Sequence, residues 1–169
     1  MEFGLRPRMT MTKNMAKQES SEENIKNATI LVVDDNEQNL ELLQAYLEDL
    51  QCRTIPAKDG VEALEIIKKS KPDLVLLDVM MPKMSGFEVC RRIKNNPQTA
   101  DLPVIMVTAL NELGDIERAI ESGTDDFLSK PVNKLELITR VKTMLKLKHL
   151  SDRLERTLAY LSEMEKQTK

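Results

Sequence analysis

Short aliphatic runs alternate with longer segments of helical period from residue 29 onward, and this alternation constrains the fold more than any other feature. Five runs have the length of a strand, and they read TILVVD, CRTIPA, DLVLLD, PVIMVT and DDFLSK. Each is followed by a segment whose apolar residues recur every three or four positions, as Leu40, Leu43 and Leu47 do. Strands that alternate with helices in this way predict an α/β fold with a parallel sheet covered by helices on both faces.

The length and composition limit the classes of protein to which the chain can belong. With 169 residues, of which 41% are hydrophobic, it can bury one core of ordinary size and has some length left over. A net charge of -3 and few aromatic residues give neither the basic surface nor the stacking platform of a nucleic-acid-binding protein. No apolar run approaches the roughly 18 residues of a membrane-spanning helix. We therefore expect no direct binding to nucleic acid or membrane, and a cytoplasmic location.

Both ends of the chain differ from the alternating region. Residues 1–27 are polar, contain several Met residues and lack the apolar middle of a signal peptide, so we expect a disordered tail or a tag there. Residues 28–148 hold the five pairs of strand and helix and are predicted to form the folded domain. The last helix continues without Gly or Pro beyond this domain, which predicts a helical extension over residues 149–169.

The last helix carries a stripe of leucines along its exposed part. Their spacing is three, four, four and three positions, and they are Leu147, Leu150, Leu154, Leu158 and Leu161. This spacing is closer to an eleven-residue repeat than to strict heptads, so any supercoil is expected to be nearly straight. An isolated helix of this kind is marginal in water, which argues for a partner helix. The stripe therefore predicts a coiled coil and a homodimer.

Polar side chains stand at the carboxyl ends of the predicted strands. Asp34 and Asp35 end the first run, Asp78 the third, Thr108 the fourth and Lys130 the fifth. In a parallel sheet with right-handed crossovers all these ends lie on one edge, where ligands bind. Three acids, one hydroxyl and one ammonium group are therefore expected to converge on a single site.

Like charges placed together require a cation, a proton or a donor to offset them. Hard carboxylate oxygens suit Mg²⁺, so we expect Asp34, Asp35 and Asp78 to hold that ion. Asp78 is then the candidate nucleophile toward phosphorus, while Lys130 offsets charge on the transferring oxygens and Thr108 donates to the phosphoryl group. No Gly-rich phosphate cradle occurs in the sequence, so a bound nucleotide is not expected.

The motifs VVDDN, LLDVMMPKMSGFEVCRRIK, PVIMVTA and DDFLSKPV together resemble the receiver domain of bacterial two-component response regulators over residues 29–148. The resemblance implies a flavodoxin-like, doubly wound five-stranded sheet in the order 2-1-3-4-5. It also implies that Asp78 accepts the phosphoryl group. By the same resemblance Asp34, Asp35 and Asp78 bind the metal, together with the backbone carbonyl of Met80.

Further roles follow from the resemblance alone. Thr108 and Phe127 correspond to the switch pair, although Phe127 stands where Tyr is often found. Lys130 corresponds to the lysine that contacts the phosphoryl group, and its bond to Pro131 is expected to be cis. The implied phosphoryl donor is a sensor histidine kinase or a phosphotransfer protein. The protein itself would phosphorylate and dephosphorylate only its own Asp78 and would pass a signal through its last helix.

The stretches DVMMPKMSGFEVCRRIK and LKLKHLSDRLER together resemble those receivers that precede cyclic-di-GMP or phosphatase output domains, in which the last helix is the linker.

Other interpretations of the same residues remain open. A single acid at a strand end is most often a helix cap, and Phe127 alone is as compatible with ordinary core as with a switch. The principal alternative function is a Mg²⁺-dependent phosphatase with an aspartyl nucleophile. Enzymes similar to the haloacid dehalogenase group carry that nucleophile on the first strand with a second acid two residues on, whereas residue 36 here is Asn. A purely helical scaffold leaves the charged strand ends unexplained.

Overall fold

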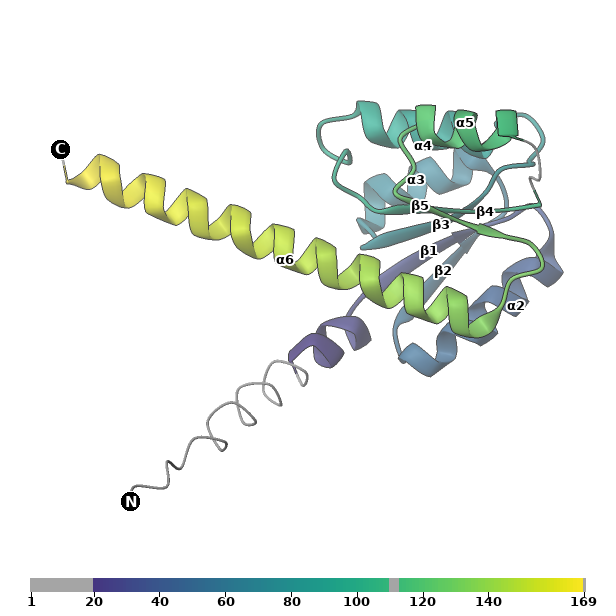
Figure 1. Ribbon diagram of the computed structural model, residues 1–169, viewed down its shortest axis with the longest axis horizontal. Helices are drawn as coiled ribbons and strands as arrows, with labels where there is room; N and C mark the ends of the chain where they lie inside the picture. The colour runs from purple at the N-terminus through teal and green to yellow at the C-terminus, as the bar shows by residue number, and fades with distance from the viewer. Residues whose placement is uncertain (1–19, 110–112, 169) are drawn as a thin grey trace, which may run out of the picture.

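A computed structural model describes residues 20–109 and 113–168, and its centre is a five-stranded parallel sheet in the order β2-β1-β3-β4-β5. Helices cover both faces of this sheet (Figure 1), as the sequence predicts. The elements, in chain order, are β1 (Thr29–Val33), α2 (Glu37–Leu47), η1 (Glu48–Leu50), β2 (Arg53–Ala57), α3 (Gly60–Ser70), β3 (Leu74–Asp78), α4 (Gly86–Asn95), β4 (Val104–Thr108), α5 (Leu113–Glu121), β5 (Asp126–Ser129) and α6 (Lys134–Gln167).

The core consists of two apolar layers, one on each face of the sheet. Successive residues of a strand point to opposite faces, so Leu31 and Val33 pack with α3, α4 and α5, whereas Ile30 and Val32 pack with α2 and α6. Every residue of β3 and β4 is buried, as expected for the central strands of a sheet covered on both sides. Polar groups are therefore expected at the ends of the strands and not within them.

Helix α6 has two parts with different environments. Its first part packs on the sheet through Leu137, Val141 and Leu145, and its N-terminus is capped by Asn133, whose side chain accepts a hydrogen bond from the backbone of Glu136. The helix then projects beyond the domain (Figure 1) and carries exposed apolar side chains. They are Leu147, Leu150, Leu154, Leu158, Tyr160, Leu161 and Met164. Within the described ranges, no helix is both long and apolar enough to cross a membrane.

The residues before β1 are partly folded. Residues 20–26 are helical, and Ile25 and Ala28 are only 5% and 6% exposed because they join the apolar layer that includes α6. Residues 20–27 thus contact the folded domain, whereas the sequence predicts a disordered tail or a tag over residues 1–27. Residues 1–19 lie outside the described part of the chain.

Candidate functional site

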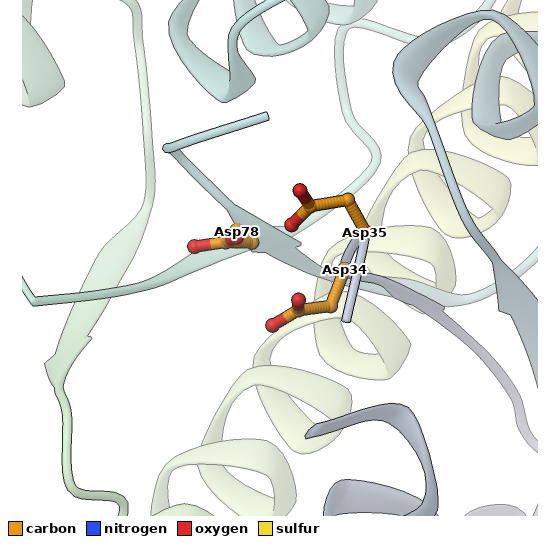
Figure 2. Close-up of side chains that lie close together, drawn as sticks. All are labelled: Asp34, Asp35 and Asp78. Atoms are coloured by element: carbon orange, nitrogen blue, oxygen red, sulfur yellow. The ribbon is translucent and has the colours of Figure 1, made fainter. Parts of the chain in front are cut away.

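Three carboxylates meet at the carboxyl edge of the sheet (Figure 2). Asp34 and Asp35 directly follow β1, and Asp78 is the last residue of β3. The two strands are neighbours with Val33 paired to Leu77, so the topology alone brings the acids together. One oxygen of each carboxylate lies within 4.8 Å of the others. The cluster predicted from the strand ends is thus present.

Asp34 is held rigidly in this cluster. It is only 1% exposed, and its two carboxylate oxygens accept hydrogen bonds from the backbone of Asn36 at 2.9 Å and from the side-chain amide of Asn39 at 3.2 Å. Asn36 also caps α2, so the start of that helix and the position of Asp34 are fixed together. Sequence reasoning did not assign Asn39 a role at the site. Its position one helical turn beyond the cap was the only available signal.

Lys130 reaches the cluster from the end of β5. Its ammonium nitrogen lies 3.1 Å from an oxygen of Asp34 and 3.3 Å from an oxygen of Asp78. Its backbone N–H donates to the carbonyl of Thr108 at 2.8 Å, which ties the loop after β5 to the end of β4. The peptide bond between Lys130 and Pro131 is cis, as the resemblance implied. The predicted convergence of Lys130 with Asp34 and Asp78 is therefore observed.

The local charges shift the pKa values of two groups. Burial raises the pKa of Asp78, and the charge of Asp34 raises it further, while Lys130 opposes both effects. Burial acts to lower the pKa of Lys130, but the hydrogen bond to Asp34 and the charge of Asp78 outweigh it, so this pKa lies above its usual value. One ammonium group thus does not balance the acids. The remaining negative charge and the set of hard oxygen donors fit a divalent cation such as Mg²⁺.

Thr108 ends β4 beside Asp78. It is 4% exposed, and its hydroxyl has no hydrogen-bond partner among the described residues. Such a group costs free energy unless something pairs with it, so the unpaired hydroxyl is consistent with a ligand oxygen in the site. Phe127 on β5 pairs with Met106 and thus lies on the same sheet face as Thr108. It is 38% exposed and is not an ordinary core residue.

Met80 lies two residues beyond Asp78, and its side chain is 69% exposed. Its backbone carbonyl as a metal ligand stays a prediction.

Gly86 is a further residue on which the site depends. It begins α4, its N–H donates to the carbonyl of Val79 at 2.9 Å, and a Cβ atom there would overlap the carbonyl oxygen of Asp78. The absence of a side chain allows α4 to approach the backbone that carries the candidate nucleophile.

We expect Gly86→Ala to destabilise the fold by about 1 to 3 kcal/mol, because the neighbouring atoms are backbone and cannot move aside without shifting Asp78. Gly114→Ala is the matched control, since a Cβ there meets no atom within 4 Å. Denaturant unfolding of both variants measures the difference. If both variants had the same free energy of unfolding, the backbone of Asp78 would not exclude a side chain at residue 86.

We also expect Asp78→Asn to be more stable than the unchanged chain in chelator at neutral pH. A carboxyl with a raised pKa stabilises the fold while protonated, and this contribution is lost as the pH rises through the folded-state pKa. Asn does not ionise, so the advantage of the variant should grow from about pH 4 upward and then level off. Thermal unfolding at a series of pH values measures it. An advantage that shrinks as the pH rises would contradict the stated charge balance.

Comparisons with known proteins agree with this geometry. Residues 30–142 match the family model described as the response regulator receiver domain. Response regulator PleD of Caulobacter vibrioides is 45% identical over 127 residues, which cover 75% of this chain and 28% of PleD. The alkaline phosphatase synthesis transcriptional regulatory protein PhoP of Bacillus subtilis is 43% identical over 120 residues, or 71% of this chain and 49% of PhoP. The chain thus spans half or less of the length of these relatives.

Solved structures give the same result. The signal receiver domain of a signal transduction histidine kinase from Syntrophus aciditrophicus superposes with a TM-score of 0.68 and 36% identity. The match covers 70% of this chain and 90% of that domain. The residues matched by the family model include Asp34, Asp78, Thr108 and Lys130. The chain therefore belongs to the response regulator receiver domain family.

Proposed function

We propose that Asp78 accepts a phosphoryl group from a histidine kinase or a phosphotransfer protein and that the modified domain passes a signal through α6. The observation that carries the proposal is the contact of Lys130 with both Asp34 and Asp78, at 3.1 and 3.3 Å, beside a buried and unpaired Thr108 hydroxyl. These groups form a nucleophile, a cation and a donor around one position. In this proposal the protein is a signalling domain that phosphorylates and dephosphorylates only its own Asp78.

In the proposed reaction an oxygen of Asp78 forms a bond to phosphorus while the bond from phosphorus to the donor's histidine nitrogen breaks. The electron pair of that bond leaves with the histidine. Lys130 would hold its ammonium group against the phosphoryl oxygens, and the Thr108 hydroxyl would donate to one of them. The carboxylates of Asp34, Asp35 and Asp78 and the carbonyl of Met80 would hold Mg²⁺, which supplies charge neutralisation when bound.

The test is direct phosphorylation of the full chain with acetyl phosphate, a small donor that needs no kinase. Intact-mass spectrometry with Mg²⁺ should detect one added phosphoryl group, and chelator should suppress it. The adduct should be lost at alkaline pH, as expected for an acyl phosphate. A chain that remains unmodified with Mg²⁺ present contradicts the proposal.

The proposal includes the division of the chain into a receiver domain over residues 28–148 and a helical extension over residues 149–169 that pairs two copies. The support is the row of apolar side chains on α6, each about half exposed or more, with nothing in the described chain to cover it. Burying such a row against an equivalent helix removes it from water. The homodimer would then bring two receiver domains to one end of a coiled coil.

The proposed signal should persist, because water must attack the phosphoryl group in line and nothing at Met80 can position it. Met80, two residues past Asp78, is apolar and 69% exposed. Leu110, two residues past Thr108, is also apolar and is expected to flank the group from its position in the sequence, but it lies outside the described residues. We expect Met80→Asn or Met80→Glu to speed loss of the phosphoryl group about tenfold or more, since a polar group can orient water.

The decay is followed by mass spectrometry after addition of excess chelator. Met80→Leu is the matched control, because it changes the side chain without adding a polar group, and its decay should equal that of the unchanged chain. If the Asn, Glu and Leu variants all lost the phosphoryl group equally slowly, this prediction would be wrong.

A further inference from the structure

A cavity of about 550 Å³ lies between the short helix at residues 20–26 and the part of α6 around residues 145–153. Asp73, which precedes β3, lines it, whereas Asp78 ends the same strand. The cavity and the phosphorylation site therefore lie at opposite ends of β3. A volume of this size is typical of sites for small molecules.

The floor of the cavity is apolar. Ile25, Ala28 and Leu145 line it and are 5%, 6% and 7% exposed, and Leu150 adds a half-exposed aliphatic side chain. No Phe, Tyr or Trp residue is among the described residues that line it. The floor thus suits an aliphatic body.

The described lining carries a net positive charge, because it holds Lys146, Lys148 and Arg153 but only two acids, Asp73 and Asp152. Lys146 and Arg153 line the cavity, and neither forms an ion pair within residues 20–109 and 113–168. The two acids of the lining are already engaged: Asp152 lies 3.4 Å from Lys148, and Asp73 accepts the N–H of Thr29 at 2.8 Å. Two cations thus remain to pair with an anion.

The wall opposite α6 is polar. Asn24 and Asn27 line the cavity, and the side-chain amide of Asn24 lies 3.2 Å from the ring of His149 on α6. Lys146, His149 and Arg153 follow one another at intervals of three and four residues and so share one face of the helix. The arrangement is an apolar floor beneath a basic and polar rim.

We propose that this cavity binds a small amphipathic anion, an aliphatic chain that ends in a carboxylate or a phosphate. The chain would lie on Ile25, Ala28 and Leu145, and the anionic head would pair with Lys146 and Arg153. The ligand would join the helix at residues 20–26 to α6. This site is separate from Asp78, which stands at the other end of β3.

The test uses the full chain labelled with ¹⁵N and decanoate as the probe, kept below the concentration at which it forms micelles. Amide signals of Asn24, Asn27 and His149 should shift and saturate, while those of Asp34 and Asp78 should not move. Decanol, which has the same chain without the charge, should bind about tenfold more weakly or worse, because it cannot pair with the cations. Equal binding of decanol and decanoate would refute the anionic ligand.

The double variant Lys146→Gln with Arg153→Gln should weaken decanoate binding about tenfold or more. The matched control is Lys142→Gln with Arg156→Gln, which removes the same charge from exposed positions of α6 outside the cavity and should bind like the unchanged chain. Equal weakening in both double variants overturns the proposal. The proposal would also be overturned if decanoate shifted only the amide signals of residues 154–164. The same holds if the protein sedimented with phosphatidylglycerol vesicles but its amide signals did not respond to decanoate.

Discussion

We expect Asp78→Asn to abolish phosphorylation by acetyl phosphate completely. The substitution keeps the size of the side chain but replaces the carboxylate by an amide, whose oxygen is a poor nucleophile toward phosphorus. Lys130 and Asp34 stay in place, so the loss isolates the chemistry of one oxygen atom. Intact-mass spectrometry with Mg²⁺ measures the fraction of modified chain.

The control for this loss is Asp101→Asn, an equivalent change at a side chain that is 61% exposed and distant from the cluster. It should be modified like the unchanged chain. Thermal unfolding of Asp78→Asn in chelator shows whether the variant is folded. It should unfold at a higher temperature than the unchanged chain, so that the loss of phosphorylation cannot come from a loss of structure. Modification of Asp78→Asn to the same extent as the unchanged chain would place the acceptor elsewhere.

The second large effect is expected on the α6 stripe. Leu154→Glu combined with Leu161→Glu should convert the proposed dimer to a monomer, weakening association by at least about a hundredfold. Each buried Leu contributes about 1.5 to 3 kcal/mol, and an ionised Glu in its place would be buried without a partner. Sedimentation equilibrium of the full chain over a range of concentrations gives the association constant.

Ala159→Glu provides the matched control for the dimer. It adds the same charge to the same helix, but the helical period places residue 159 well away from the line of Leu147, Leu154 and Leu161. This variant should remain dimeric. An unchanged chain that is monomeric at high concentration, with or without a phosphoryl group, would remove the basis for a coiled coil.

The fold and much of the site follow from the sequence, because each depends on patterns that local segments carry. Strand runs such as LVLLD, in which every residue is buried, and helices with apolar residues three or four apart determine the layers. Topology then brings Asp34 and Asp78 together without any further information. Lys130 contacts Asp78, as its position at a strand end predicts, whereas the roles of Lys130 and Thr108 toward a phosphoryl group stay predictions.

Features that depend on distant parts of the chain were not predicted. The helix at residues 20–26 has one deeply buried apolar residue, Ile25, and its contact with α6 joins residues 125 positions apart. No periodic pattern signals such a contact. Gly86 is similar, because its requirement arises from the backbone of Asp78, which only the folded structure brings close. The amide of Asn39 on Asp34 likewise needs the geometry of the helix start.

The continuity of α6 gives the molecule a lever. The helix begins four residues after Lys130 and runs without interruption from the sheet to Gln167. Its projecting part, residues 146–167, is about 33 Å long at roughly 1.5 Å per residue. A tilt of about 5° at Leu145, the last buried residue of the helix, would move the far end by about 3 Å. A movement at the base of the helix that is too small to disturb the packing of the core would thus displace the tip by about the distance between two contacting atoms.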